Sequence, residues 1–248
     1  MSISQDNRLL SISASFISKD AIAIGLQGSE EISQPFNFSV TILSKNHALS
    51  SSDVIGQKCS VTLTHQDADT PRYFHGRVNS FSLGELEGDF RQYTLRLVPG
   101  FWFATQSQHH RIFEEMSAKD IISSVLREFG DFCNFKDNTS ATYLTREYCV
   151  QYGESDFEFV TRLMQEEGIF YYFEHKESEH TMVLGDSTSA YTDCKESRVK
   201  INVGSDMDDK ARVLSWHREM NYHTGTFETS DYNHNTPKNF YKQTLATK

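Results

Sequence analysis

The chain has 248 residues, a length that accommodates one large domain or two ordinary ones with real cores. Hydrophobic residues make up 38% and charged residues 23%, which is typical of a folded globular protein and not of a disordered one. The net charge of −10, with no run of Lys and Arg, argues against nucleic-acid binding and against adsorption to anionic lipid.

The usual signals for membrane passage are missing from the sequence. No stretch approaches the ~20 apolar residues of a membrane-spanning helix. Residues 1–7 lack the basic start and apolar run of a secretory signal. We therefore expect a cytoplasmic protein that, if it leaves the cell, does so without the general export route.

The first hundred residues alternate between apolar and polar side chains, as strands with one buried face do. The clearest segment is residues 36–42 (FNFSVTI), which predicts buried Phe36, Phe38, Val40 and Ile42 between more exposed neighbours. The other inward positions of this alternation are Leu10, Ile12, Ala14, Phe16, Ile22, Ile24, Leu26, Cys59, Val61, Leu63, Tyr93, Leu95 and Leu97. Short strands separated by turn residues predict an antiparallel β-barrel over residues 1–104.

After Pro99 the period changes to that of helices. Ser117 and Asp120 predict a capped helix that ends at Gly130, and Ser155 with Glu158 predicts a second that ends at Gly168. The apolar faces of these two helices comprise Ile121, Ile122, Val125, Leu126 and Phe129, and then Phe157, Val160, Leu163 and Met164.

Strand signals follow the second predicted helix. Residues 169–173 (IFYYF) and 181–184 (TMVL) predict a hairpin, which completes a small α/β subdomain over residues 105–190. Alternation resumes at Val199, Ile201 and Val203, and residues 211–216 and 225–229 predict further strands. Because residues 191–248 are too few to enclose a core, we expect them to be an opened, incomplete domain.

A series of motifs runs through the chain in a defined order and spacing. It begins with residues 74–78 (FHGRV), residues 93–99 (YTLRLVP) before Trp102, and residues 111–113 (RIF). It continues with residues 146–152 (REYCVQY), Glu154-Ser155, residues 159–163 (FVTRL), residues 166–169 (EEGI), Tyr171-Tyr172-Phe173, His180, Val183-Leu184 and Asp186. Asp231-Tyr232-Asn233 and Pro237 come last. In its order and spacing this series resembles the VgrG family of type VI secretion spike proteins.

This resemblance implies the fold of a contractile-tail hub, in which two similar β-barrels carry a small α/β insertion. In such hubs three chains associate, and six barrels form a ring that matches the hexameric Hcp-type tube. The family continues into an oligonucleotide/oligosaccharide-fold domain and a triple-stranded β-helix. The resemblance implies that residues 191–248 are an incomplete second β-barrel, and we expect this chain to stop there, before that spike. The implied partners are further copies of the chain, the Hcp-type tube, and effectors or baseplate proteins, with no nucleic acid. The implied location is cytoplasmic until assembly and then secreted through the apparatus.

Several residues invite a chemical interpretation, and each has a simpler one. His109, His110 and His180 lack the H-E-x-x-H or C-x-x-C partners of a zinc site, so surface or strand-packed histidines are expected. Glu166 and Glu167 end the second predicted helix near Arg162, which predicts an ion-paired surface and not a catalytic carboxylate pair.

Four further features also have a simpler, structural interpretation. Asp206, Asp208 and Asp209 lack the bidentate acid of a calcium loop, and residues 84–88 (GELEG) predict a turn because no phosphate-loop Lys follows. The aromatic residues 170–173 favour a core strand over a stacking platform for bases or sugars. The widely spaced Cys59, Cys133, Cys149 and Cys194 favour buried free thiols, with zinc or disulfide chemistry as the alternative.

We therefore expect no catalytic, cofactor or metal residues. The sequence predicts a structural hub of the type VI secretion machine. One alternative is the baseplate hub of a contractile phage or bacteriocin tail. The alternative of another class is a cell-wall-degrading enzyme, for which no carboxylate pair stands out.

Overall fold

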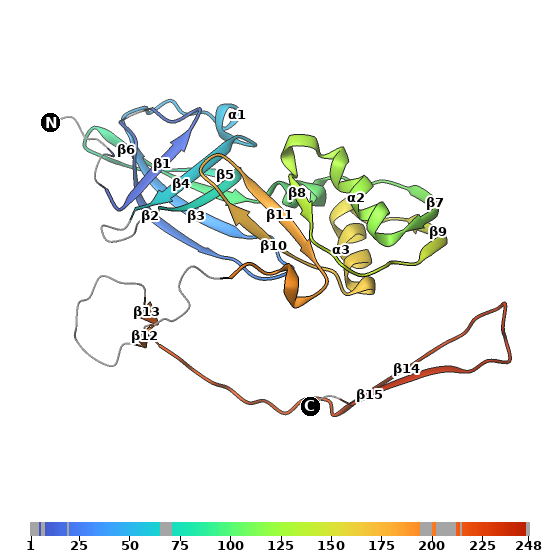
Figure 1. Cartoon of the computed structure of the whole chain (residues 1–248). Coiled ribbons are helices and arrows are strands. Elements are labelled where there is room, and N and C mark those ends of the chain that lie inside the picture. Colours follow the sequence, from blue (N-terminus) through green and yellow to red (C-terminus); the bar gives the residue numbers. More distant parts are fainter. Residues whose placement is uncertain are drawn as a thin grey trace. The chain divides into compact units, whose positions relative to one another are not determined.

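The computed structural model describes residues 5, 8–18, 20–64, 71–193, 200–201, 212–213 and 215–246 (Figure 1). The chain divides into two compact units, Met1–Cys194 and Lys195–Lys248. The sequence predicts domain boundaries at residues 104 and 190, which divide the chain more finely than these two units. That finer division remains a prediction. Among the described residues, no helix is both long and apolar enough to cross a membrane.

The first unit begins with a six-stranded antiparallel sheet, whose strand order is β1-β4-β5-β6-β3-β2. Its strands are β1 (Leu10–Ala14), β2 (Ile22–Ser29), β3 (Asn37–Ser44), β4 (Lys58–Leu63), β5 (Arg72–Glu87) and β6 (Phe90–Val98), with the short helix α1 (Ser51–Val54) between β3 and β4. The sheet is curled, and its edge strands β1 and β2 contact each other without forming a ladder in the described part of the chain. The predicted antiparallel, barrel-like sheet is thus confirmed as a half-barrel.

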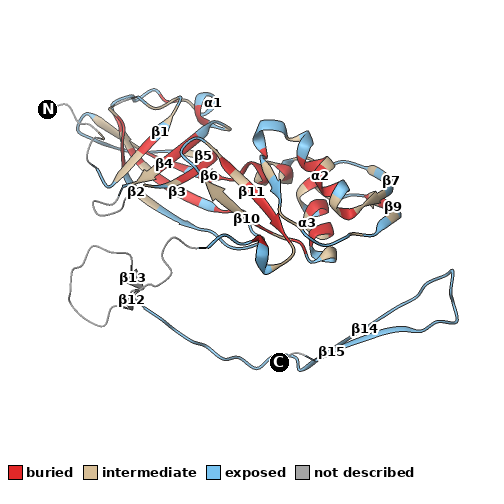
Figure 2. Cartoon of the chain, in the orientation of Figure 1, coloured by how far each residue is buried: buried red, intermediate tan, exposed pale blue. Residues whose placement is uncertain are grey.

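The core of this sheet follows the predicted alternation (Figure 2). Phe36, Phe38, Val40 and Ile42 are buried, whereas Asn37 is exposed. The inward residues of β3 stand opposite those of β6, in the pairs Phe38–Leu97, Val40–Leu95 and Ile42–Tyr93. Because a slip of one residue would turn every side chain to the other face, this register is set by the apolar pattern itself.

Two predictions within the sheet are wrong. Ile24 was expected inward but is 46% exposed, because the ladder shifts between Ala23 and Gly25 and both Ile22 and Ala23 are buried instead. Residues 84–88 were expected to form a turn, but β5 continues to Glu87 and the turn lies at residues 88–89. Pairing with β6, which includes an irregular step, carries the chain past Gly84 as a strand.

The rest of the first unit is a mixed α/β part. Its helices are η1 (Gly100–Gln106), α2 (Ala118–Glu128), η2 (Gly130–Phe132), α3 (Asp156–Glu167) and η3 (Thr188–Ala190). Its strands are β7 (Arg111–Ser117), β8 (Phe135–Asp137), β9 (Thr145–Gln151), β10 (Phe170–His175) and β11 (His180–Gly185). Strands β7 and β9 form an antiparallel ribbon, whereas β10 pairs antiparallel with β11, which pairs parallel with β8.

Both long helices have the predicted caps. The Ser117 hydroxyl accepts a hydrogen bond from the Asp120 backbone N–H, and Ser155 with Glu158 forms a complete capping box. Gly168 ends α3 at φ = 70°, a left-handed conformation that glycine adopts without strain.

One residue on the predicted face of α3 is misplaced. Phe157 is only half-buried and packs against Phe101, while Phe159 fills the core position together with Val160, Leu163 and Met164. The face of α2 is as predicted, with Ile121, Ile122, Val125 and Leu126 buried and Phe129 packed at its margin.

The β10–β11 hairpin contacts both cores of the first unit. Its Tyr171, Met182 and Leu184 belong to the helical core, and Phe173 packs against both that core and the core of the six-stranded sheet. Its ring stands edge-on to Phe36, with ring centroids 5.0 Å apart. The hairpin therefore ties the two parts of the unit together (Figure 1).

The regular elements described in the second unit are all short strands. They are β12 (Lys200–Ile201), β13 (Arg212–Val213), β14 (Thr226–Asp231) and β15 (Tyr241–Ala246). The strand predicted at residues 225–229 is confirmed as β14, which pairs antiparallel with β15. Val199, Val203 and the acidic residues Asp206, Asp208 and Asp209 lie outside the described residues, as does Cys194.

We predict that the two isoleucines Ile42 and Ile24 differ sharply in their contribution to stability. Ile42→Ala should lower the free energy of unfolding by about 2–5 kcal/mol, because it leaves a cavity at a fully buried site. Ile24→Ala, the matched control, should change it by no more than about 0.5 kcal/mol. Urea denaturation measures both, and equal losses would contradict the bulge in β2.

A second prediction concerns the cap of α3. Ser155→Ala should lower the free energy of unfolding by about 1 kcal/mol, because the N-cap acceptor is lost. Ser124→Ala in the middle of α2 is the control and should be neutral or slightly stabilising, since alanine is the better helix former. Thermal unfolding that does not separate the two variants would contradict the cap assignment.

Candidate functional site

The three histidines considered as metal ligands lie in separate places. His109 contacts Asp156, the exposed His110 ring lies tilted beside Tyr152 at a centroid distance of 5.1 Å, and His180 is buried elsewhere. Among the described residues no group of His, Cys, Asp and Glu is arranged to hold a metal ion. His180 and His110 therefore have the strand-packed and surface positions that the sequence predicted.

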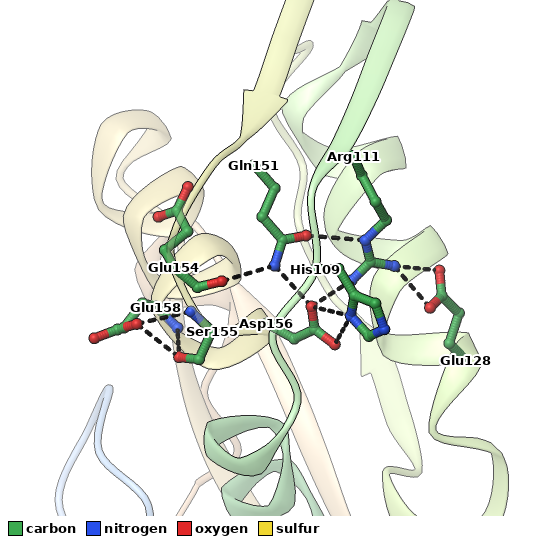
Figure 3. Close-up of polar contacts among 8 residues, drawn as sticks. All are labelled: His109, Arg111, Glu128, Gln151, Glu154, Ser155, Asp156 and Glu158. Carbon is green, nitrogen blue, oxygen red and sulfur yellow. Dashed lines mark hydrogen bonds and ion pairs between the residues drawn. The ribbon is translucent and has the colours of Figure 1, made fainter.

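The most buried charged group of the α/β part is the carboxylate of Asp156, at the first residue of α3 (Figure 3). It receives a hydrogen bond from the Gln151 amide at 2.8 Å and lies 3.0 Å from Nδ1 of His109. The Arg111 guanidinium forms an ion pair with it and also binds Glu128 on α2 at 2.6 Å. The Asp156 carboxylate on α3 thus connects directly to β7 and β9, and through Arg111 to α2.

Local structure explains why these groups meet. The β7–β9 ladder sets Arg111 opposite Gln151, and the arginine Nε donates to the glutamine side-chain oxygen at 2.9 Å. Burial by itself would raise the pKa of Asp156, but the hydrogen bonds from Gln151 and His109 and the charge of Arg111 outweigh it and hold that pKa below its ordinary value. The carboxylate is therefore ionised, and its hydrogen bonds and ion pair are made with side chains of this chain.

A second polar group covers the outer side of α3. Arg146 on β9 binds Glu166 at 2.8 Å and Glu167 at 2.6 Å. Arg162 binds Glu154 at 2.6 Å and Glu166, four residues further on, at 3.1 Å. The predicted ion-paired surface is confirmed, and the two glutamates hold β9 against the helix.

A third polar group, which we call the histidine junction, consists of His75, His175 and His180. Nδ1 of His75 lies 2.8 Å from Nδ1 of His180, and the Gly100 backbone N–H donates to Nε2 of His180 at 3.0 Å. Nδ1 of His175 accepts from the His75 backbone N–H at 3.1 Å, and its Nε2 lies 2.9 Å from Glu30. The junction attaches the end of the β10–β11 hairpin to β5.

The remaining candidates have structural places. Cys59, Cys133 and Cys149 are buried free thiols, and burial raises the pKa of Cys59 and of Cys133 to about 12. In the aromatic run 170–173, Tyr171 is buried and its neighbours are partly buried in β10.

Sequence reasoning did not single out Asp156, His75 or His175. Asp156 follows a capping serine and looks like an ordinary first-turn acid. The usable signal was in the family motifs, because Arg111 and Gln151 stand in the RIF and REYCVQY segments and His75 in FHGRV. Only the pairing of strands far apart in the sequence shows that these polar residues share partners.

We predict that Asp156→Ala lowers the free energy of unfolding by on the order of 3–5 kcal/mol, because it leaves Arg111 and Gln151 without their buried partner. Glu179→Ala is the control, since Glu179 forms an exposed pair with Lys176 that water screens, and this change should affect stability far less. Urea denaturation at neutral pH measures both. A loss for Asp156→Ala as small as that for the control would show that the network does not hold the fold.

The chain is similar to phage tail hubs and to type VI secretion spike proteins. Residues 29–247 match the family described as phage tail baseplate hub (GPD). Two Pseudomonas aeruginosa proteins, type VI secretion system spike proteins VgrG1b and VgrG1a, are 32% and 36% identical over 96% and 67% of this chain. The matches span 32% and 26% of those proteins, so this chain covers at most about a third of their length.

Solved structures show the same fold. An E. coli protein, c3393, described as a component of the type VI secretion system similar to T4 bacteriophage tail proteins gp27 and gp5, matches with a TM-score of 0.67 at 24% identity. That match covers 78% of this chain and 52% of the E. coli chain. The 43 kDa tail protein of prophage MuSo2 from Shewanella oneidensis matches with a TM-score of 0.52 at 15% identity, over 79% and 56% of the two chains. By its family match, this chain belongs to the phage tail baseplate hub (GPD) family.

Proposed function

We propose that this chain is part of the hub of a type VI secretion spike. Three copies associate, seat on the end of an Hcp-type tube and are delivered with it, from the cytoplasm through the apparatus. The observation that carries this proposal is the match of 96% of the chain, at 32% identity, to a spike protein. The role is mechanical, and we propose no catalytic, cofactor or metal site.

The polar side chains of the first unit support a mechanical role. The carboxylates of Asp156, Glu166 and Glu167 are taken up by internal ion pairs with arginines. A hydrolase of sugars needs two carboxylates held apart across a cleft with room for substrate and water. Because these three carboxylates bind arginines that connect strands to helices, they stiffen the subunit. They do not form a pair held apart across a cleft.

Exposed apolar side chains support the proposed association with copies or partners. On the outer side of the β7–β9 ribbon, Ile112 and Tyr148 are more than half exposed. In the second unit, Phe227 and Leu245 face each other across β14 and β15 and are equally exposed. A two-stranded hairpin is marginal in water alone, so association that covers its apolar face would stabilise it.

The second candidate is the baseplate hub of a contractile phage or bacteriocin tail. It is favoured by the fold shared with the prophage tail protein of Shewanella oneidensis. The identity to several spike proteins of Pseudomonas aeruginosa gives the secretion machine the stronger support.

We predict that deleting the gene for this protein in its host abolishes release of the Hcp-type tube protein into the medium. The wild-type gene should restore release. Phe227→Ser with Leu245→Ser should restore it at least several-fold less well, because the apolar face of the hairpin is lost. Immunoblots of supernatants measure release, with a cytoplasmic marker to exclude lysis.

The control variant is Thr244→Ala, on the opposite face of the same hairpin, which should restore release fully. Unchanged tube release after deletion, together with loss of intact tails after prophage induction, would favour the phage hub. Cell-wall hydrolysis by the purified protein would contradict the structural role.

A further inference from the structure

The end of the β10–β11 hairpin docks on the six-stranded sheet through the histidine junction. His175 and His180 face each other at the last paired position of the hairpin, and His75 lies on β5. His75 is 3% and His180 6% exposed, so water cannot readily replace a hydrogen bond lost between them. The Phe36 ring stands edge-on to His180 at a centroid distance of 5.4 Å.

The contacts of His180 determine the protonation of both buried rings. Because the Gly100 N–H donates to Nε2 of His180, that nitrogen must carry a lone pair, and the neutral ring has its proton on Nδ1. Nδ1 of His180 then donates to Nδ1 of His75, which leaves the proton of His75 on Nε2. The arrangement that satisfies both hydrogen bonds therefore contains two neutral histidines.

An additional proton breaks one of these bonds. On Nε2 of His180 it removes the acceptor of the Gly100 N–H, and on Nδ1 of His75 it places two hydrogens between nitrogens 2.8 Å apart. Either form leaves a buried polar group without its partner, which is costly in a packed interior. We propose that the histidine junction is an acid-sensitive latch, which holds the hairpin end on the sheet while both rings are neutral and releases it when either takes a proton.

The charged groups around the latch favour the neutral, closed form. Cationic Lys58 on β4 and Arg77 on β5 act on the pair, as does His175 on β10. Burial, followed by these neighbours, lowers the pKa of His75 to about 4 and of His180 to about 2, against a weak opposing effect of Glu179 on His75. The nearby carboxylate of Glu30 is bound to His175 and Arg72.

The pH range of release follows from these directions. An open or unfolded chain takes up protons near the ordinary histidine pKa of about 6.5, whereas the closed form does not until much lower pH. Closing is therefore fully favoured above pH ~6.5 and weakens as pH falls from there toward 4. Each histidine reduces the closing equilibrium constant by up to roughly tenfold per pH unit. Asp156 and Asp186 have lowered pKa values and stay ionised in this range.

Hydrogen–deuterium exchange of the full chain tests the latch. Between pH 7 and pH 5, protection of Gly100 and of the amides of β10 and β11, corrected for intrinsic exchange rates, should fall at least tenfold in the wild type. In the double variant His75→Asn with His180→Gln, the two buried side chains do not titrate, so the fall in protection should be at least several-fold smaller than in the wild type. His110→Gln, at an exposed site outside the junction, should behave as the wild type.

A pH dependence that is unchanged in the double variant would overturn the proposal. If the double variant is already open at pH 7, the wild type alone decides through NMR titration of its histidine ring protons. The rings of His75 and His180 should not titrate until the hairpin loses protection. Titration of both rings near pH 6.5 with the hairpin fully protected would equally refute the latch.

Discussion

The first unit depends on one shared element, the β10–β11 hairpin. Its apolar side chains complete the helical core, and Phe173 also packs against the core of the six-stranded sheet. Apolar burial alone would allow this hairpin to slide or rotate, because hydrophobic contacts are not directional. The histidine junction supplies the directional contacts that fix the hairpin end on β5.

Ion pairs supply directional contacts in the same way around α3. Asp156 with Arg111, and Arg146 with Glu166 and Glu167, connect the β7–β9 ribbon to the two long helices. The ribbon also packs on the helical core through Phe113 and Cys149, and the charged side chains add directional contacts to this apolar packing. For a subunit proposed to transmit force within a tail hub, such cross-links between small elements keep the unit from shearing.

Several residues behind the family resemblance make these contacts. His75, Arg111 and Arg146 belong to motifs recognised from the sequence, and each has a partner from a distant segment. The motifs therefore specify how the strands and helices of the hub are joined. This agrees with membership in a family of phage tail baseplate hubs.

The sequence by itself determined the elements whose signals are local. The alternation of residues 36–42, the caps at Ser117 and Ser155 and the stop at Gly168 each rest on neighbours within a few residues, and the structure confirms them. The bulge that exposes Ile24 and the continuation of β5 through Gly84 depend on the facing strand, which no local pattern contains. The ion pair of Asp156 with Arg111 and the hydrogen bonds of His180 likewise involve segments tens of residues away. Only tertiary packing decides these partners, because a polar side chain that folding removes from water must find a hydrogen-bonding partner within the protein.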